Sequence, residues 1–139
     1  MDKFNKLLAS GEPMVLGLFR IVTGLLLFQY GVAKILKFPA LPYFASPPPL
    51  IMTAGGIELV LGALLIIGLW TRPVAFILSG EMAFAYFMGH MLKNLDAPVF
   101  IPLINGGSAA ILFCFACLYL ACAGGGPLSV DAMMRKRKK

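Results

Sequence analysis

Three ionisable residues, Arg20, Glu58 and Glu81, lie inside long apolar stretches of the sequence. An isolated charge in hydrocarbon costs at least ~2.5–3.5 kcal/mol on insertion scales, so such groups are expected to pair or to face a polar cavity. Arginine carries five N–H donors and can bind two carboxylates. The sequence therefore predicts a polar layer in which Arg20 contacts at least one glutamate. The second glutamate is expected to be protonated or to face a cavity.

Glycines surround two of these charges with the same spacing, in the windows 17–24 and 55–62. Small residues on one helix face allow two membrane helices to approach closely, which places Arg20 and Glu58 between helices and away from lipid. Two interpretations of the polar layer follow. It is either a structural lock that fixes helix pairing, or a proton-linked or ligand-contacting site.

Four further polar residues are secondary candidates: Lys34, His90, Asn105 and Ser108. His90 is the only histidine and falls near the end of an apolar stretch, where it is either an interfacial residue or a ligand-binding group. No metal site is predicted, because the carboxylates lie too deep in the membrane to bind a metal ion together with His90. Asn105 and Ser108 can cap a helix or form hydrogen bonds between helices.

Cys114 and Cys117 form a C-x-x-C pair within one apolar stretch that also holds Cys122. In a membrane thiol oxidase such a pair passes electrons to a quinone. This pair, however, lies near the middle of its stretch and far from any cation that would activate a thiol. Buried cysteine behaves as a small apolar residue, so we expect the three cysteines to be dispensable.

The composition indicates a membrane protein, with 60% hydrophobic and only 13% charged residues among 139. Soluble domains carry about 25% charged residues, and the mean hydropathy here is +0.88. Disordered chains, disulfide-rich secreted modules and nucleic-acid-binding domains fit this composition poorly. A chain of this length forms one domain.

Four apolar segments have about the 20 residues that a membrane-spanning helix needs. They cover approximately 14–36, 50–70, 73–92 and 102–123. Their residues do not alternate as in a β-barrel, and the bilayer requires internally bonded backbone, so the predicted fold is all-α, a transmembrane four-helix bundle. The chain is expected to divide into three parts. Residues 1–12 form an N-terminal segment that is either interfacial or frayed, residues 13–123 form the transmembrane domain, and residues 124–139 form a basic tail.

The distribution of lysine and arginine predicts that both termini are cytoplasmic. Eight such residues fall on the side of the termini and the second loop, and three on the side of the loops 37–49 and 93–102. Five of the eight form the run from Arg135 to Lys139, which we expect to contact anionic lipids rather than nucleic acid.

The order and spacing of several short motifs resemble the DoxX family of small four-helix membrane proteins over about residues 15–123. The motifs are Arg20 with Gly24, Gly31 and Lys34, Glu58 with Gly62, the turn 68–72, Glu81 with His90, and Asn105 with Gly106 and Gly107. Members of that family often carry an acidic residue after the Asn-Gly pair, where this chain has Ser108.

This resemblance implies a subunit of a redox-linked system in a bacterial inner membrane, non-catalytic on its own. Members are associated with thiosulfate:quinone oxidoreduction and with thiol or oxidative-stress complexes. By analogy it allows a quinone as cofactor, a soluble redox protein as partner and a homo-oligomer, and leaves open whether the chain is an enzyme. Two alternatives remain. One is a quinone-linked oxidoreductase subunit whose protons pass through Arg20, Glu58 and Glu81; the other is a small transporter or exporter component that uses the same layer.

Overall fold

The computed structural model describes residues 1–138, so Lys139 of the predicted lipid-binding run lies outside the described residues. Those residues form helices and loops without any strand, as the all-α prediction requires. The elements are α1 (Asp2–Ile35), the 3-10 helix η1 (Pro42–Phe44), α2 (Pro49–Ile67), α3 (Thr71–Phe84), the π-helix η2 (Ala85–Met91), α4 (Pro102–Asn105), α5 (Ser108–Ala123) and α6 (Val130–Arg137).

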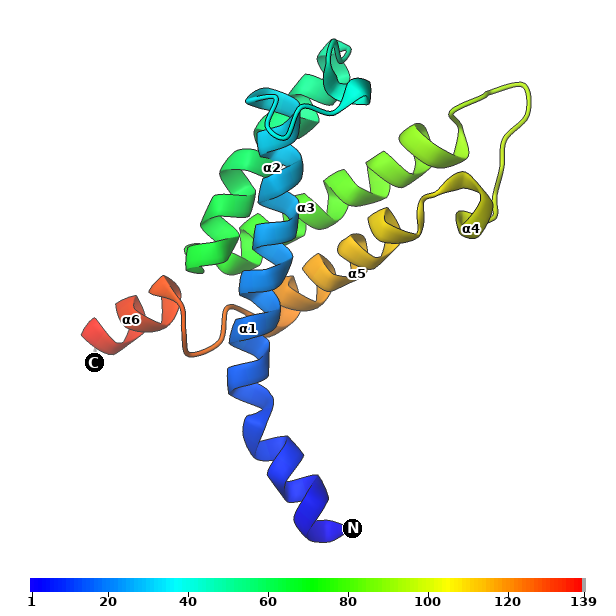
Figure 1. The fold of residues 1–139 in the computed structure, drawn as a ribbon. Coiled ribbons are helices and arrows are strands. Elements are labelled where there is room, and N and C mark those ends of the chain that lie inside the picture. Colours follow the sequence, from blue (N-terminus) through cyan, green and yellow to red (C-terminus); the bar gives the residue numbers. More distant parts are fainter. Residues whose placement is uncertain (139) are drawn as a thin grey trace.

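The long helices form two antiparallel pairs, α1 with α2 and α3 with α5. The pairs meet near the short turn between α2 and α3 and diverge toward the loops at their other ends (Figure 1). Gly68 ends α2 in the left-handed conformation, with φ of 71°, as glycine does at many helix ends. This turn brings the end of α2, the start of α3 and the C-terminal helix α6 to one side of the molecule.

The first helix is longer than the predicted span, which began near residue 14. α1 starts at Asp2 and continues through Pro13, and its first nine residues are exposed. The N-terminal end extends away from the other helices (Figure 1). Residues 2–12 include lysine, leucine, alanine and glutamate, which favour helix, so the expected boundary between residues 12 and 13 falls inside a continuous helix.

The fourth predicted span, 102–123, is not one helix. α4 ends at Asn105, Gly106 adopts a left-handed φ of 74°, and α5 begins at Ser108. The 16 residues of α5 rise ~24 Å, less than the ~30 Å of hydrocarbon. Within residues 1–138, three helical stretches are long and apolar enough to cross a membrane: α1, α2 and α3 with its extension η2.

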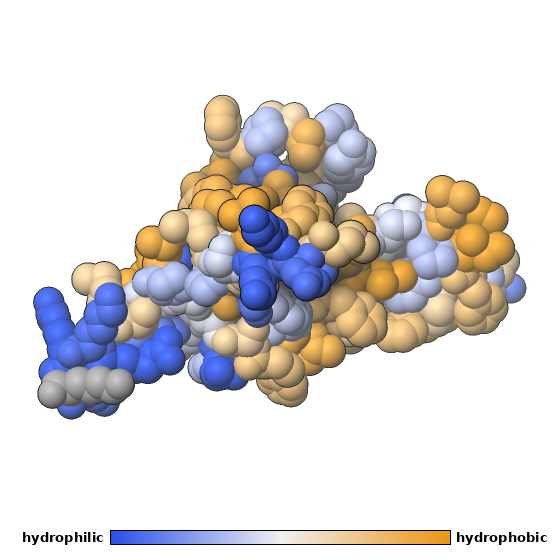
Figure 2. Space-filling view, turned by 90° about the horizontal axis from the view of Figure 1, so that it is seen from below, coloured by the Kyte–Doolittle hydropathy of each residue, from blue (hydrophilic) through white to orange (hydrophobic). Residues whose placement is uncertain are grey.

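The apolar core lies where α1, α2, α3 and α5 meet. Its fully buried members include Leu27, Leu65, Leu78, Cys117 and Leu120. Many other large apolar side chains are exposed along the same helices, and apolar surface covers much of the face seen from below (Figure 2). An apolar surface of this extent is typical of a chain that is surrounded by lipid.

Candidate functional site

The glycine-lined faces of α1 and α2 pack directly against each other. A Cβ atom added to Gly24 would lie 2.8 Å from the amide nitrogen of Ile66 and 3.1 Å from the carbonyl oxygen of Gly62. One added to Gly31 would lie 2.8 Å from the carbonyl oxygen of Gly55. Neither position has room for a side chain, so the expected close approach of the first two spans is confirmed.

Glu58 forms a buried ion pair with Lys34 between these two helices. The Lys34 Nζ donates to both carboxylate oxygens of Glu58, at 2.8 and 2.7 Å. The Glu58 side chain is 2% exposed and that of Lys34 is 12% exposed. The same Nζ lies 5.8 Å from the ring centre of Tyr30 and 5.7 Å from that of Phe44. Lys34, expected to be a secondary candidate, is therefore the partner of Glu58.

Glu81 on α3 belongs to the same polar region. Its side chain is partly buried, and its Oε2 has no hydrogen-bond partner among residues 1–138. The charges of Glu58 and Lys34 lie close enough to act on it. The structure thus brings Glu58 and Glu81 into one region, with Lys34 as the basic group.

Arg20 does not take part in that region, and the expected pairing of Arg20 with a glutamate is wrong. Its side chain is fully buried, and its Nη2 donates to the carbonyl oxygen of Leu128 at 2.6 Å. Gly68 and Ser129 lie against the guanidinium group. Its Nε and Nη1 have no hydrogen-bond partner within the described chain. Arg20 therefore connects α1 to the segment that precedes α6.

The direction of helical side chains explains this difference. Each Cα–Cβ bond tilts toward the start of its own helix. In the antiparallel pair α1–α2, the side chains of the two helices therefore lean in opposite directions. Lys34, near the end of α1, and Glu58, in the middle of α2, lean toward each other, whereas Arg20 leans away from Glu58. Helix register separates them further: Gly24 packs against Gly62 and Ile66, and the Arg20 guanidinium lies against Gly68, ten residues after Glu58 and ~15 Å along the helix axis, so the two residues do not lie at one depth.

Asp131 on α6 caps the start of α3. Its Oδ1 accepts from the amide of Trp70 and its Oδ2 from the amide of Thr71, both at 2.8 Å. Its own amide donates to the carbonyl oxygen of Gly68 at 3.0 Å. Partial burial opposes ionisation, but the hydrogen bonds outweigh it and lower the pKa of Asp131 below its usual value. Nothing in the sequence analysis anticipated this docking of the C-terminal segment.

Loss of this cap is expected to be measurable and dependent on pH. Asp131→Ala should lower the free energy of unfolding by about 1 kcal/mol near neutral pH, the usual effect of losing a helix N-cap. Because folding lowers the pKa of Asp131, its contribution is present above the unfolded pKa of ~3.9 and is lost as the pH falls through the folded value. Unfolding in detergent at about pH 7 and about pH 3 measures both effects.

Asp96→Ala is the matched control, because Asp96 is an exposed loop residue. An Asp131→Ala variant whose stability matched that of Asp96→Ala at both pH values would contradict the cap.

Asn105 organises the far end of α3 and α5. Its Nδ2 donates to the carbonyl oxygen of Val99 and its Oδ1 accepts from the amide of Gly107, both at 2.8 Å. The Nδ1 of His90 lies 3.1 Å from the backbone oxygen of Asn105. Asn105 thus holds the loop before α5 in place, and His90 lies beside it rather than near Glu81.

Tyr86, on the π-helix η2, joins this group although it was not a candidate. Its hydroxyl donates to the carbonyl oxygen of Phe100 at 3.1 Å, and its ring packs against Gly107. Ser108, in contrast, is exposed at the start of α5. A π-helix often marks a functional position, and that irregularity is not readable from the apolar pattern.

The three cysteines are free thiols in different surroundings. Cys117 is fully buried in the core, Cys122 is exposed, and the Sγ of Cys114 lies 3.5 Å from the Oγ of Ser79. Cys117 fills core volume as an apolar residue does.

Replacing Cys114 and Cys117 with alanine and Cys122 with serine is expected to cost about 1 kcal/mol of stability, because only the buried Cys117 leaves a cavity. Thermal unfolding of the triple variant and of Cys122→Ser alone measures this. Complete loss of function in a Cys114→Ala chain that still folds would instead indicate thiol redox chemistry.

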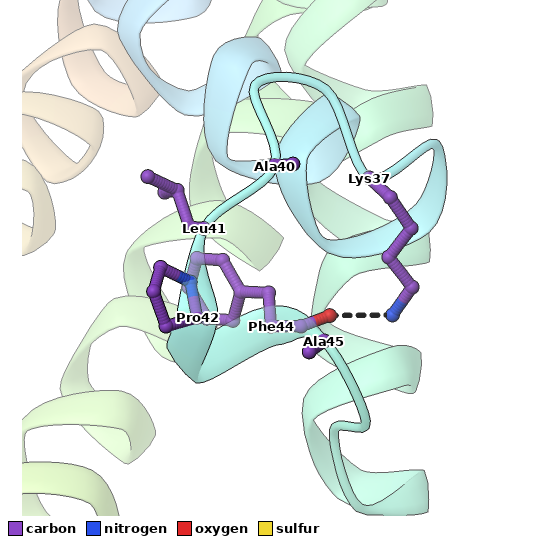
Figure 3. Close-up of a pocket in the computed structure, with 6 residues that line it drawn as sticks. All are labelled: Lys37, Ala40, Leu41, Pro42, Phe44 and Ala45. Carbon is purple, nitrogen blue, oxygen red and sulfur yellow. Dashed lines mark hydrogen bonds between the residues drawn. The ribbon is translucent and has the colours of Figure 1, made fainter.

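Two of the cavities formed by the described residues are open and lie at the ends of the helices, away from Glu58 and Glu81. One, of about 350 Å³, is in the loop after α1, where Lys37 donates to the carbonyl oxygen of Phe44 at 2.6 Å (Figure 3). The other, of about 310 Å³, lies between the start of α3, the end of α5 and α6. Within residues 1–138, no three His, Cys, Asp or Glu side chains are grouped so that they could hold a metal ion.

Comparisons with known proteins agree with the resemblance seen in the motifs. The family model described as DoxX matches residues 15–91, more than half of the chain. A protein of Haemophilus influenzae, described as uncharacterized, is 39% identical over 129 residues, which cover 91% of this chain and 95% of the relative. No solved structure matches. The chain is therefore a membrane protein of the DoxX family.

Proposed function

We propose that this protein is an inner-membrane subunit of a redox-linked system and has no catalytic activity by itself. The observation that supports this proposal is the use of its intramembrane charges within the chain. Lys34 and Glu58 join α1 to α2, and Arg20 joins α1 to the segment before α6. These charged groups therefore stabilise the fold. A chain whose charges serve its own fold fits the role of a scaffold that positions a redox partner. The redox association itself follows from the DoxX family resemblance.

The proposed arrangement is a four-helix bundle in which α4 and α5 together complete the fourth crossing, with both termini in the cytoplasm. Single cysteines at exposed positions, Ala45→Cys before α2 and Lys136→Cys on α6, test the orientation in a chain without native cysteines. A membrane-impermeant maleimide is expected to label position 45 in intact cells and position 136 only after permeabilisation. The reverse pattern would contradict the orientation.

Quinone reduction by thiosulfate or by a dithiol tests the function. Membranes that lack this protein are expected to lose part of that activity, and the purified chain alone in proteoliposomes should remain at background. Unchanged activity in the deficient membranes would overturn the redox association. Quinone reduction by the purified chain would overturn the non-catalytic role.

A quinone-linked role is the second candidate, because Glu81 has a buried oxygen without a hydrogen-bond partner among residues 1–138 beside the Lys34–Glu58 pair. In that role Glu81 would exchange a proton with the quinone while the partner protein supplies electrons. The Glu81→Gln variant, returned to the deficient membranes, separates the two roles. Under the scaffold role it restores full activity, and under the quinone-linked role it folds but does not restore it.

A further inference from the structure

The cavity of about 310 Å³ at the start of α3 is lined by an excess of positive charge. Arg72, Arg135 and Lys138 supply three cations, and Asp131 supplies one carboxylate. That carboxylate already accepts two backbone amides, at 2.8 Å each. Arg135 interacts electrostatically with Asp131, but among residues 1–138 none of the three cations forms a salt bridge with it, so they can bind an anion that enters the cavity.

The helices that carry the cationic residues are fixed at the cavity, although the Arg135 and Lys138 side chains themselves are exposed. Arg72 donates to the carbonyl oxygens of Ala121 and Cys122 at the end of α5. Lys138, the C-cap of α6, follows Arg135 by three residues and keeps a right-handed helical backbone conformation, so the two lie on one side of the helix end. The contacts of Asp131 fix that helix against α3. Over its described residues, the basic tail therefore forms one wall of this cavity.

The cavity lies where spanning helices end, at the depth of lipid headgroups. Trp70, 61% exposed, and Met134, 41% exposed, line it together with the basic groups. Tryptophan is enriched at membrane interfaces, where one side of the ring meets lipid and the other meets water. Hydrophilic residues gather toward the C-terminal end of the chain, next to apolar surface (Figure 2). A charged headgroup beside acyl chains matches this combination better than a free anion does.

We propose that this cavity binds the phosphate-bearing headgroup of an anionic phospholipid, with Arg135 and Lys138 as its principal contacts. Arg72 adds positive charge from the opposite wall, and Trp70 and Met134 contact the first acyl carbons. This site goes beyond the proposed redox role and does not depend on it. It differs from general attraction between a basic tail and a membrane, because only the cations at the cavity take part.

Two double variants on the same helix separate a defined site from general attraction. Arg135→Gln with Lys138→Gln removes two cavity cations. Lys136→Gln with Arg137→Gln removes the same charge from exposed residues that do not line the cavity. The measurement is the retention of phosphatidylglycerol or phosphatidylcholine by the full-length detergent-purified protein, titrated by native mass spectrometry.

The cavity variant is expected to lose at least about tenfold in affinity for phosphatidylglycerol, and the control variant less than about threefold. Phosphatidylcholine is expected to bind the parent protein weakly. Equal losses of affinity for phosphatidylglycerol in both variants would overturn the site and would show general electrostatic attraction instead. Equal retention of the two lipids would also overturn it. Complete displacement of phosphatidylglycerol by an equal concentration of inorganic phosphate would show a free-anion site instead.

Discussion

Glu58→Ala is expected to lower the free energy of unfolding by about 3–5 kcal/mol, because it leaves the Lys34 ammonium without its partner between α1 and α2. The Glu58 carboxylate is 2% exposed and accepts both hydrogen bonds from one Nζ, at 2.8 and 2.7 Å. The close contact at Gly31 and Gly55 holds the helix backbones together. They cannot separate to admit water without losing that packing.

A variant that lacks both charges identifies the origin of this loss. Lys34→Met combined with Glu58→Leu removes both charges and keeps side chains of similar size. Replacing a buried ion pair by apolar residues is often neutral or stabilising, so the double variant should recover most of the stability lost in Glu58→Ala. Unfolding by sodium dodecyl sulfate in mixed micelles, followed by circular dichroism, measures all variants. A Glu58→Ala chain within about 1 kcal/mol of the parent would contradict a buried pair.

Arg20→Met is expected to release the C-terminal segment from the helices. The guanidinium of Arg20 is fully buried and donates to the Leu128 carbonyl at 2.6 Å. A hydrogen bond from a charged group contributes about 1.5–3 kcal/mol, and its loss also leaves the Leu128 carbonyl without this donor. Hydrogen exchange should therefore increase over 127–137, whereas the α1–α2 contact around Gly31 should stay protected.

Lys37→Met is the matched control, because Lys37 also donates to a backbone carbonyl, that of Phe44, but is exposed. It is expected to change stability by less than about 1 kcal/mol, since water replaces an exposed partner readily. Arg20→Lys keeps a cation and should restore part of the protection. Unchanged exchange over 127–137 in Arg20→Met would show that Asp131 alone secures the segment.

The apolar pattern was sufficient to predict the all-helical chain and most of its helix positions. α2 begins and ends within a few residues of its predicted span, because Pro49 and Gly68 mark its limits in the sequence. The break at Gly106 was not predicted, although Asn105, Gly106, Gly107 and Ser108 are residue types that favour turns. The left-handed φ of Gly106 and the hydrogen bond from the Gly107 amide to the Asn105 Oδ1 form the break locally, and the Tyr86 ring packs against Gly107.

The candidate polar residues were recognised individually, but their partners were not. Depth along a helix placed Arg20, Glu58 and Glu81 in one layer, whereas the register of α1 against α2 places Arg20 at Gly68 and brings Lys34 to Glu58. Long-range contacts of this kind depend on how helices pair. The capping of α3 by Asp131 is a still harder case, because no local pattern connects two segments 60 residues apart.

The contact between Arg20 and Leu128 also has a consequence for biosynthesis. The two residues are 108 positions apart in the sequence. At a synthesis rate of about 5–20 residues per second, the Leu128 carbonyl leaves the ribosome about 5–20 s after Arg20 does. During that interval α1 and α2 can already associate through their glycines, while the guanidinium has no acceptor from the C-terminal segment. A nascent or prematurely terminated chain therefore carries an intramembrane arginine that lacks this hydrogen bond until residue 128 has been synthesised.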